Sequence, residues 1–120
     1  MRSLLTALIL CIFLAACTYH SEESLYSNSP CNTTNVTYST TVAGIINANG
    51  CLNCHGPVNP TGGFSLNDYA GVKAKVTDGR LYGAVNHSPG FSPMPQGSIR
   101  MNQCQIDQLK SWIDHGAPNN

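Results

Sequence analysis

The stretch CLNCH, residues 51–55, brings Cys51, Cys54 and His55 within five positions of one another. Glycine precedes it, and glycine and proline follow it, so turn-forming residues stand on both sides. Thiol and imidazole groups bind transition metals, and thiols also take part in redox chemistry. The stretch therefore indicates a metal, redox or covalent cofactor site, and the rest of the chain has to decide among them.

Helical patterns lie on both sides of this stretch. Residues 39–50 predict a helix with Ser39 or Thr40 as its cap, ended by Asn49-Gly50. A second helix is expected from Asn67 or Asp68 to about residue 76, and one or two further turns are expected over residues 81–85. Residues 86–98 carry three prolines and two glycines, which predicts a stiff irregular loop.

The clearest helix is the last, from Gln103 to His115, with Asn102 as its cap. Gly116 supplies the residue that ends it, and Pro118 prevents its continuation. One face is apolar and the opposite face is polar; the apolar positions are Ile106, Leu109, Trp112 and Ile113. No convincing strand pattern occurs, so the predicted fold class is all-α with long loops.

The N-terminus resembles a bacterial lipoprotein signal. Met1 and Arg2 precede the apolar run Leu4–Ala16, which is too short for a membrane-spanning helix and suits a signal peptide. The run ends in LAAC, which predicts a signal peptide over residues 1–16 and lipidation of Cys17; the alternative is an ordinary secretion signal. Residues 17–38 are rich in Ser, Thr and Asn and are interpreted as a flexible membrane tether.

Two cysteines lie outside the signal, the lipid site and the CLNCH stretch, and in an exported protein such cysteines can form a disulfide. Of six cysteines, Cys11 lies in the signal, and Cys31 and Cys104 belong to neither the lipid site nor the CLNCH stretch. These two are expected to form a disulfide.

Composition argues against nucleic acid as a partner, because six Lys and Arg balance six Asp and Glu and give no basic face. The one basic cluster is Lys73, Lys75 and Arg80, which is either a solvated face or a docking patch.

Three interpretations of CLNCH can now be compared. Structural zinc needs four ligands, usually in two pairs, and no second pair is recognisable in the sequence. A thioredoxin-like CxxC requires a βαβ setting, which the helical pattern does not supply. In the third interpretation, two cysteines at this spacing each form a thioether to one haem vinyl group, and the adjacent histidine binds the iron. Covalent attachment also retains the cofactor in a domain too small to enclose it by packing alone.

With these marks the chain resembles a class I cytochrome c domain of the small single-haem bacterial lipoprotein type. The resemblance covers residues 39–120: a helix leading into CLNCHG, a proline-rich loop with Met94-Pro95, and a terminal helix ending in WIDHGAP. It implies a cytochrome c-like fold of three to five helices around one haem c. Cys51 and Cys54 would carry the haem covalently, with His55 as the proximal iron ligand and a methionine as the distal one.

Met94 is the expected distal ligand, because Pro93 and Pro95 restrict its backbone and reduce the entropy lost on binding. Met101 is expected to fill the core, and His87 is the main rival for the distal position. The resemblance also implies that two helices cross closely, with Gly44 against Trp112. Cys31 and Cys104 are not part of the basic cytochrome pattern.

An iron with both axial positions filled by the protein has no free site for substrate. The expected function is therefore a membrane-anchored carrier of single electrons between redox partner proteins, not an enzyme. The alternatives are a haem peroxidase, or a gas-binding or sensor domain, whose sixth position opens; His87 and Arg80 or Arg100 would be its distal groups. The expected location is the bacterial cell envelope, on the periplasmic or cell-surface side and at the outer rather than the inner membrane.

Overall fold

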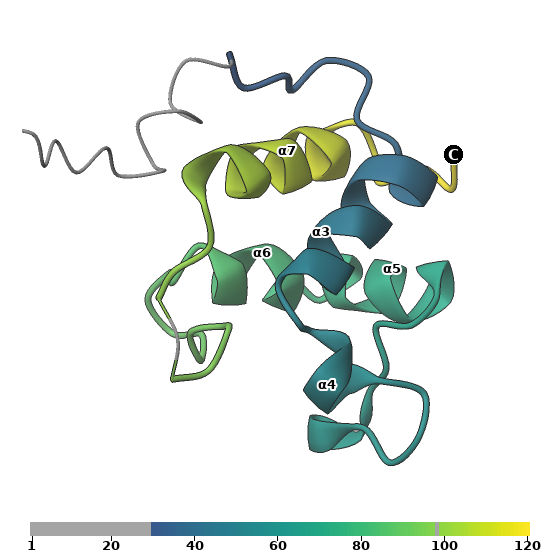
Figure 1. The fold of residues 1–120 in the computed structure, drawn as a ribbon, viewed down its shortest axis with the longest axis vertical. Coiled ribbons are helices and arrows are strands. Elements are labelled where there is room, and N and C mark those ends of the chain that lie inside the picture. The colour runs from purple at the N-terminus through teal and green to yellow at the C-terminus, as the bar shows by residue number, and fades with distance from the viewer. Residues whose placement is uncertain (1–29, 98) are drawn as a thin grey trace, which may run out of the picture. The chain divides into compact units, whose positions relative to one another are not determined.

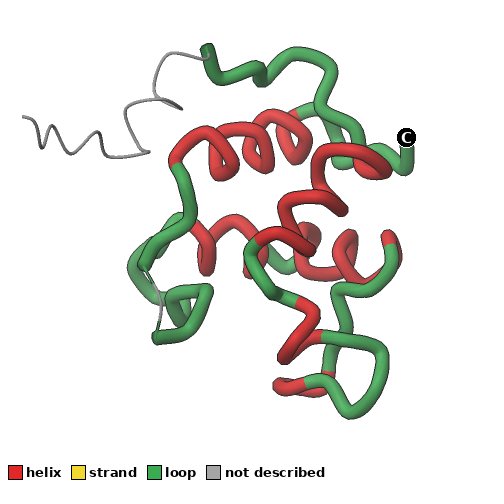
Figure 2. The backbone as a smooth tube through the Cα atoms, in the orientation of Figure 1, coloured by secondary structure: helices red, strands yellow, loops and turns green. Residues whose placement is uncertain are grey.

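The computed structural model describes residues 30–97 and 99–120, and Figures 1 and 2 show helices joined by loops, with no strand among these residues. The all-α prediction is confirmed at this level. The expected signal peptide and the lipidation site Cys17 lie outside the described residues. The helices are α3 (Ala43–Ala48), α4 (Leu52–His55), α5 (Tyr69–Thr77), α6 (Arg80–Val85) and α7 (Gln103–Asp114), with a π-helical turn Tyr38–Val42 before α3 and a 3-10 turn Thr61–Gly63 after α4.

Helix α7 forms the centre of the core. Its cap is the predicted one, because Asn102 Oδ1 accepts a hydrogen bond of 2.8 Å from the backbone N–H of Cys104. Ile106, Leu109 and Trp112 are at most 1 % exposed, which confirms the predicted apolar face. Each such side chain contributes about 1.5–3 kcal/mol to folding by leaving water. The helix ends at Asp114, one residue earlier than predicted.

The first predicted helix is also present, with a different start. Thr37, rather than Ser39 or Thr40, is the cap, and its side chain accepts a hydrogen bond from the Thr40 N–H. The π-helical turn then continues into α3, which descends from the C-terminal end of α7 towards α4 in Figure 1. Ile45 and Ile46 of α3 are buried in the core.

Residues 31–38, which the sequence assigns to the tether, lie against α7. Cys31 is joined to Cys104 by a disulfide. Gln108 and Ser111 donate side-chain hydrogen bonds of 3.0 and 2.8 Å to the carbonyls of residues 32 and 33. Tyr38 packs edge-on against Tyr69, with ring centroids 5.2 Å apart. These residues belong to the compact unit Cys31–Asn120.

Helices α5 and α6 pack together below α7 in Figure 1. Asp68 caps α5 as predicted, with its carboxylate accepting from the Gly71 N–H at 2.8 Å. Gly79 connects the two helices in the left-handed conformation, at φ +75°, which glycine adopts without strain. Within the described ranges no helix combines the length and apolar character needed to cross a membrane.

The expected close packing of Gly44 against Trp112 is wrong. Gly44 is exposed, and a Cβ added to it would meet no atom within 4 Å. A close contact between a helical glycine and an aromatic ring occurs instead on α6, where a Cβ on Gly83 would lie 2.5 Å from the Phe91 ring. Gly83 therefore allows the 86–97 loop to lie directly on the helix.

Candidate functional site

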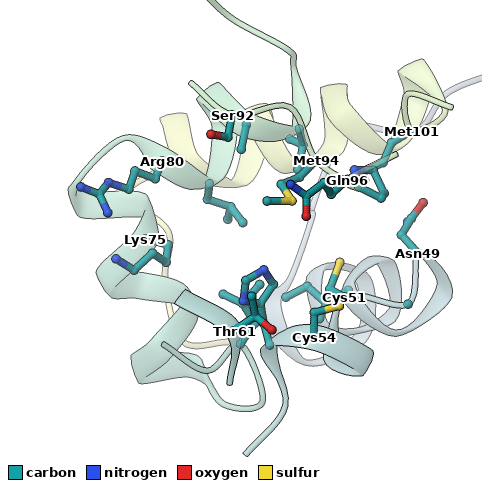
Figure 3. A pocket seen from close by; sticks show the side chains of 18 of the residues that line it. Asn49, Cys51, Cys54, Thr61, Lys75, Arg80, Ser92, Met94, Gln96 and Met101 are labelled. Atoms are coloured by element: carbon teal, nitrogen blue, oxygen red, sulfur yellow. The ribbon is translucent and has the colours of Figure 1, made fainter. Parts of the chain in front are cut away.

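A cavity of about 700 Å³ lies between helices α3 and α4 on one side and α6 with the 86–97 loop on the other. Its size is within the range of sites that hold compact organic ligands. The walls are mostly apolar, with Ile45, Ile46, Leu66, Leu81, Val85 and Leu109 among them. In Figure 3, Cys51 and Cys54 lie on one side of this cavity, and Met94 extends into it from the opposite side.

Helix α4 presents the two thiols. Cys51 is the residue before its first turn, and its N–H donates to the Ile46 carbonyl at 3.1 Å, so the chain continues from α3 into α4 with one bend. Residues three positions apart in a helix lie on one face, which brings Cys51 and Cys54 to the same wall. Both are free thiols; Cys54 is exposed, and burial raises the pKa of the half-buried Cys51 thiol.

His55 is held in the cavity wall from both sides. Its backbone N–H donates to Cys51 O at 2.8 Å, and its own carbonyl accepts from Leu66 N–H at 2.8 Å. The Phe64 ring stacks on the imidazole, with centroids 4.3 Å apart and an interplanar angle of 18°. The backbone bonds position the residue, and the stack with Phe64 restricts rotation of the ring.

The imidazole of His55 is only 9 % exposed, and its Nδ1 is the one buried side-chain nitrogen or oxygen without a hydrogen-bond partner in the described part of the chain. A buried polar atom in this state costs free energy, and a missing ion or ligand is one physical reason for it. The donor set of two thiols, one imidazole and one thioether around an apolar cavity fits a haem bound through CxxCH. Among residues 30–97 and 99–120, no group of three His, Cys, Asp or Glu side chains is placed to hold a metal ion by itself.

Met94 and Met101 both line the cavity but differ in their surroundings. Met101 is 6 % exposed and belongs to the core cluster. Met94 is half-buried in the loop, and its backbone N–H donates to the Ala84 carbonyl of α6 at 3.0 Å. The sulfur of Met94 thus sits on a segment anchored to a helix, across from the thiols (Figure 3).

His87, the expected rival of Met94, is exposed and does not line the cavity. Its ring Nε2 lies 3.1 Å from the Met94 carbonyl oxygen. Arg100, named above as a distal group, donates instead to Asn86 and Gln103 at 2.7 and 2.6 Å. Arg80 does line the cavity, although its side chain is 68 % exposed.

The three cations of the basic cluster make different contacts. Lys73 Nζ donates to the Gly116 carbonyl at 2.6 Å, beyond the end of α7. Lys75 and Arg80 stand at the cavity wall and both approach Asp78, at 2.7 and 3.7 Å. The hydrogen bond from Lys75 holds the pKa of Asp78 below its ordinary value. Lys73 thus contacts the C-terminal segment, whereas Lys75 and Arg80 lie beside the cavity.

No protein-family model, curated protein or solved structure matches the chain.

The sequence did not identify Phe64 or Phe91 as site residues, although both line the cavity. Phe64 carries two contacts, the stack on His55 and the ammonium of Lys75 at 4.8 Å from its ring centroid. The sequence did contain one indication of their role. Each phenylalanine lies in a loop rich in glycine and proline, so its ring has to pack against residues from elsewhere in the chain to be buried.

Proposed function

We propose that residues 39–120 bind one haem c covalently through Cys51 and Cys54, and that the protein carries single electrons. His55 would be the proximal iron ligand and Met94 the distal one. The observation that carries the proposal is the shared cavity. One apolar space is lined both by Cys51, Cys54 and His55 of CLNCH and by Met94, which lies in a loop some forty residues later. The resemblance of this chain to small cytochromes c supplies the identity of the group.

The donor chemistry supports the proposal. Cysteine thiols form thioethers with vinyl groups, and the one-turn spacing of Cys51 and Cys54 sets both on one wall. His55 is kept from rotating by Phe64 and has an unpaired buried nitrogen. A thioether such as that of Met94 is a soft ligand that favours the reduced iron.

When bound, haem supplies a one-electron ferric–ferrous couple, whose potential methionine ligation raises relative to two histidines. The residues of this chain would hold both axial positions and keep them closed to substrate. The apolar walls of the cavity would exclude water from the bound group, and His55, stacked on Phe64, and the Met94 loop, anchored to α6, would limit rearrangement when the charge changes. We further propose that a lipid on Cys17 keeps the carrier at the outer membrane of the cell envelope, near its redox partner proteins.

A peroxidase or gas-binding role would require a distal catalytic group beside an open sixth position. His87 and Arg100 form hydrogen bonds elsewhere, and Arg80 approaches Asp78. No specific contact favours that alternative over electron transfer.

The experiment is a comparison of purified wild type, the Cys51→Ala/Cys54→Ala double variant, Met94→Ala and Met101→Ala, produced in cells that attach haem to c-type cytochromes. Denaturing gels stained for haem test attachment, and absorption spectra of the oxidised and reduced forms test ligation. The wild type should retain haem after denaturation, and the double variant should not. The ferric charge-transfer band of methionine–iron ligation should vanish in Met94→Ala and persist in Met101→Ala, the matched control.

Each part can fail separately. Covalent haem in the double variant would refute attachment through CLNCH. A band that survives in Met94→Ala would refute Met94 as ligand. A wild type that lacks the band and binds carbon monoxide rapidly would favour the open-site alternative over the carrier.

A further inference from the structure

The loop that carries Met94 is closed at its base by a hydrogen-bond network. Arg100 donates to Asn86 Oδ1 at 2.7 Å and to Gln103 Oε1 at 2.6 Å, which links the end of α6 to the start of α7. Asn86 in turn donates to Ser88 Oγ at 3.1 Å. The network fixes where the loop leaves and rejoins the helices, but it does not touch the tip that holds Met94.

His87 makes the contact at the tip. Its Nε2 lies 3.1 Å from the Met94 carbonyl oxygen. A carbonyl oxygen can only accept, so Nε2 carries the proton and donates. The backbone N–H groups of His87 and Met94 also both donate to the Ala84 carbonyl, at 3.2 and 3.0 Å. His87 and α6 thus hold the Met94 backbone at its N–H and at its carbonyl.

The backbone of His87 is itself unusual. Its φ is +55°, in the left-handed region, which is uncommon for residues other than glycine but is adopted by histidine, asparagine and aspartate more often than by the rest. The side chain is exposed, so burial of the ring does not account for a histidine at this position. The contact with Met94 does account for it, because the left-handed turn directs the chain so that the ring reaches that carbonyl.

We propose that His87 is a positioning residue for Met94, an inference that rests on the proposed function. It does not bind the iron; it holds the Met94 backbone so that the thioether stays directed into the cavity. Its loss raises the population of conformations in which the sulfur has left the metal. The net contribution of one hydrogen bond corresponds to a change of roughly three- to tenfold in that population.

The test measures the rate at which cyanide binds to the ferric protein, since cyanide reaches the iron only when the sulfur of Met94 has left. His87→Gly removes the ring and keeps the left-handed backbone without strain. His87→Gln retains an N–H donor on a side chain of similar length. His87→Leu has no donor but, like His87→Gln, places a side chain with a Cβ in the left-handed backbone conformation. His115→Ala is the control, because that histidine is exposed, does not line the cavity, and has its ring Nδ1 2.7 Å from Ser111 O of α7.

The sulfur charge-transfer band should persist in all four variants. Cyanide should bind roughly three- to tenfold faster in His87→Gly and His87→Leu, and close to the wild-type rate in His87→Gln and His115→Ala. Equal rates in His87→Gly and wild type, with the band present, would overturn the role of His87 and leave the proposed function intact. Loss of the band in His87→Gly and its retention in His87→Leu would also overturn it, because the donor would then not be the cause. Absence of the band from the wild type would overturn the proposed ligation, and this inference with it.

Discussion

The contact between Gly83 and Phe91 gives the sharpest prediction about the fold, because the chain contains its own control. A Cβ on Gly83 would lie 2.5 Å from two carbons of the Phe91 ring and 2.7 Å from a third. Carbon atoms pack at about 3.5–4.0 Å, so the ring would have to move by about 1 Å or more. Gly44 also lies in a helix, but a Cβ there would meet nothing within 4 Å.

The comparison between Gly83→Ala and Gly44→Ala isolates the Phe91 contact. Alanine is favoured over glycine in a helix by about 0.5–1 kcal/mol, and this gain applies to both variants. Gly44→Ala should therefore raise the free energy of unfolding by that amount. Gly83→Ala carries in addition an overpacking cost of about 1–3 kcal/mol. The cost is expected near the lower end of this range, because Phe91 is 39 % exposed and its ring can move outward.

The assay is urea unfolding followed by circular dichroism, with the midpoint compared at constant m-value. A double-variant cycle completes it: with Phe91→Ala in place, Gly83→Ala should become stabilising, as Gly44→Ala is. If Gly83→Ala stabilises the protein as much as Gly44→Ala in the presence of Phe91, the packing of the loop on α6 is not as described. Phe91 is three residues from Met94 and lines the cavity, so, if Met94 binds the iron as proposed, the same variant should also weaken the methionine–iron band.

Two further predictions concern the cysteines outside CLNCH. Replacing Cys31 and Cys104 together by serine should lower the free energy of unfolding by about 2–4 kcal/mol, because the disulfide spans a sequence separation of 73 residues. In the wild type, mass spectrometry of a non-reduced digest should find the two cysteines in one linked peptide. Free thiols at both positions would contradict the disulfide. Cys17→Ser should block lipidation and leave an unprocessed precursor without acyl label, whereas normal maturation and membrane retention of this variant would indicate an ordinary secretion signal.

Sequence periodicity predicted those parts of the fold that depend on local information. The apolar face of α7 repeats at helical spacing over twelve residues, and Asn102 and Asp68 are strong caps, so the start of α7 was found at the correct residue and the start of α5 was narrowed to two adjacent residues. The CLNCH spacing likewise identified three cavity residues, because ligand chemistry is carried by residue type and separation. Short elements were missed: α4 has four residues and too little periodicity to be recognised.

Contacts between loops could not be predicted in the same way. Gly44 was expected at a close crossing of two helices, but the close contact is made by Gly83, with the Phe91 ring of a loop. Nothing in the sequence of either helix distinguishes the two glycines. The role of His87 depends on a left-handed backbone and on a carbonyl seven residues later. Stacking of Phe64 on His55 depends on how the residues between them turn back, which residue types alone do not determine.

The core and the cavity share their residues, and this links cofactor binding to folding. Ile45, Ile46, Leu81, Leu109 and Met101 are all at most 8 % exposed, yet all five also line the cavity. Side chains that face an internal space lose van der Waals contacts on that side. The loss matters because a domain of this size buries little apolar surface. A flat apolar group held in that space would restore these contacts and would bind only the folded chain, which stabilises it by mass action. The proposed covalent attachment at Cys51 and Cys54 would make this stabilisation permanent, because the group could not dissociate when the chain opens. On this reasoning the proposed thioether bonds would serve the fold as well as the proposed electron transfer, and the contacts of His87 and α6 with the Met94 backbone would hold the opposite wall in place.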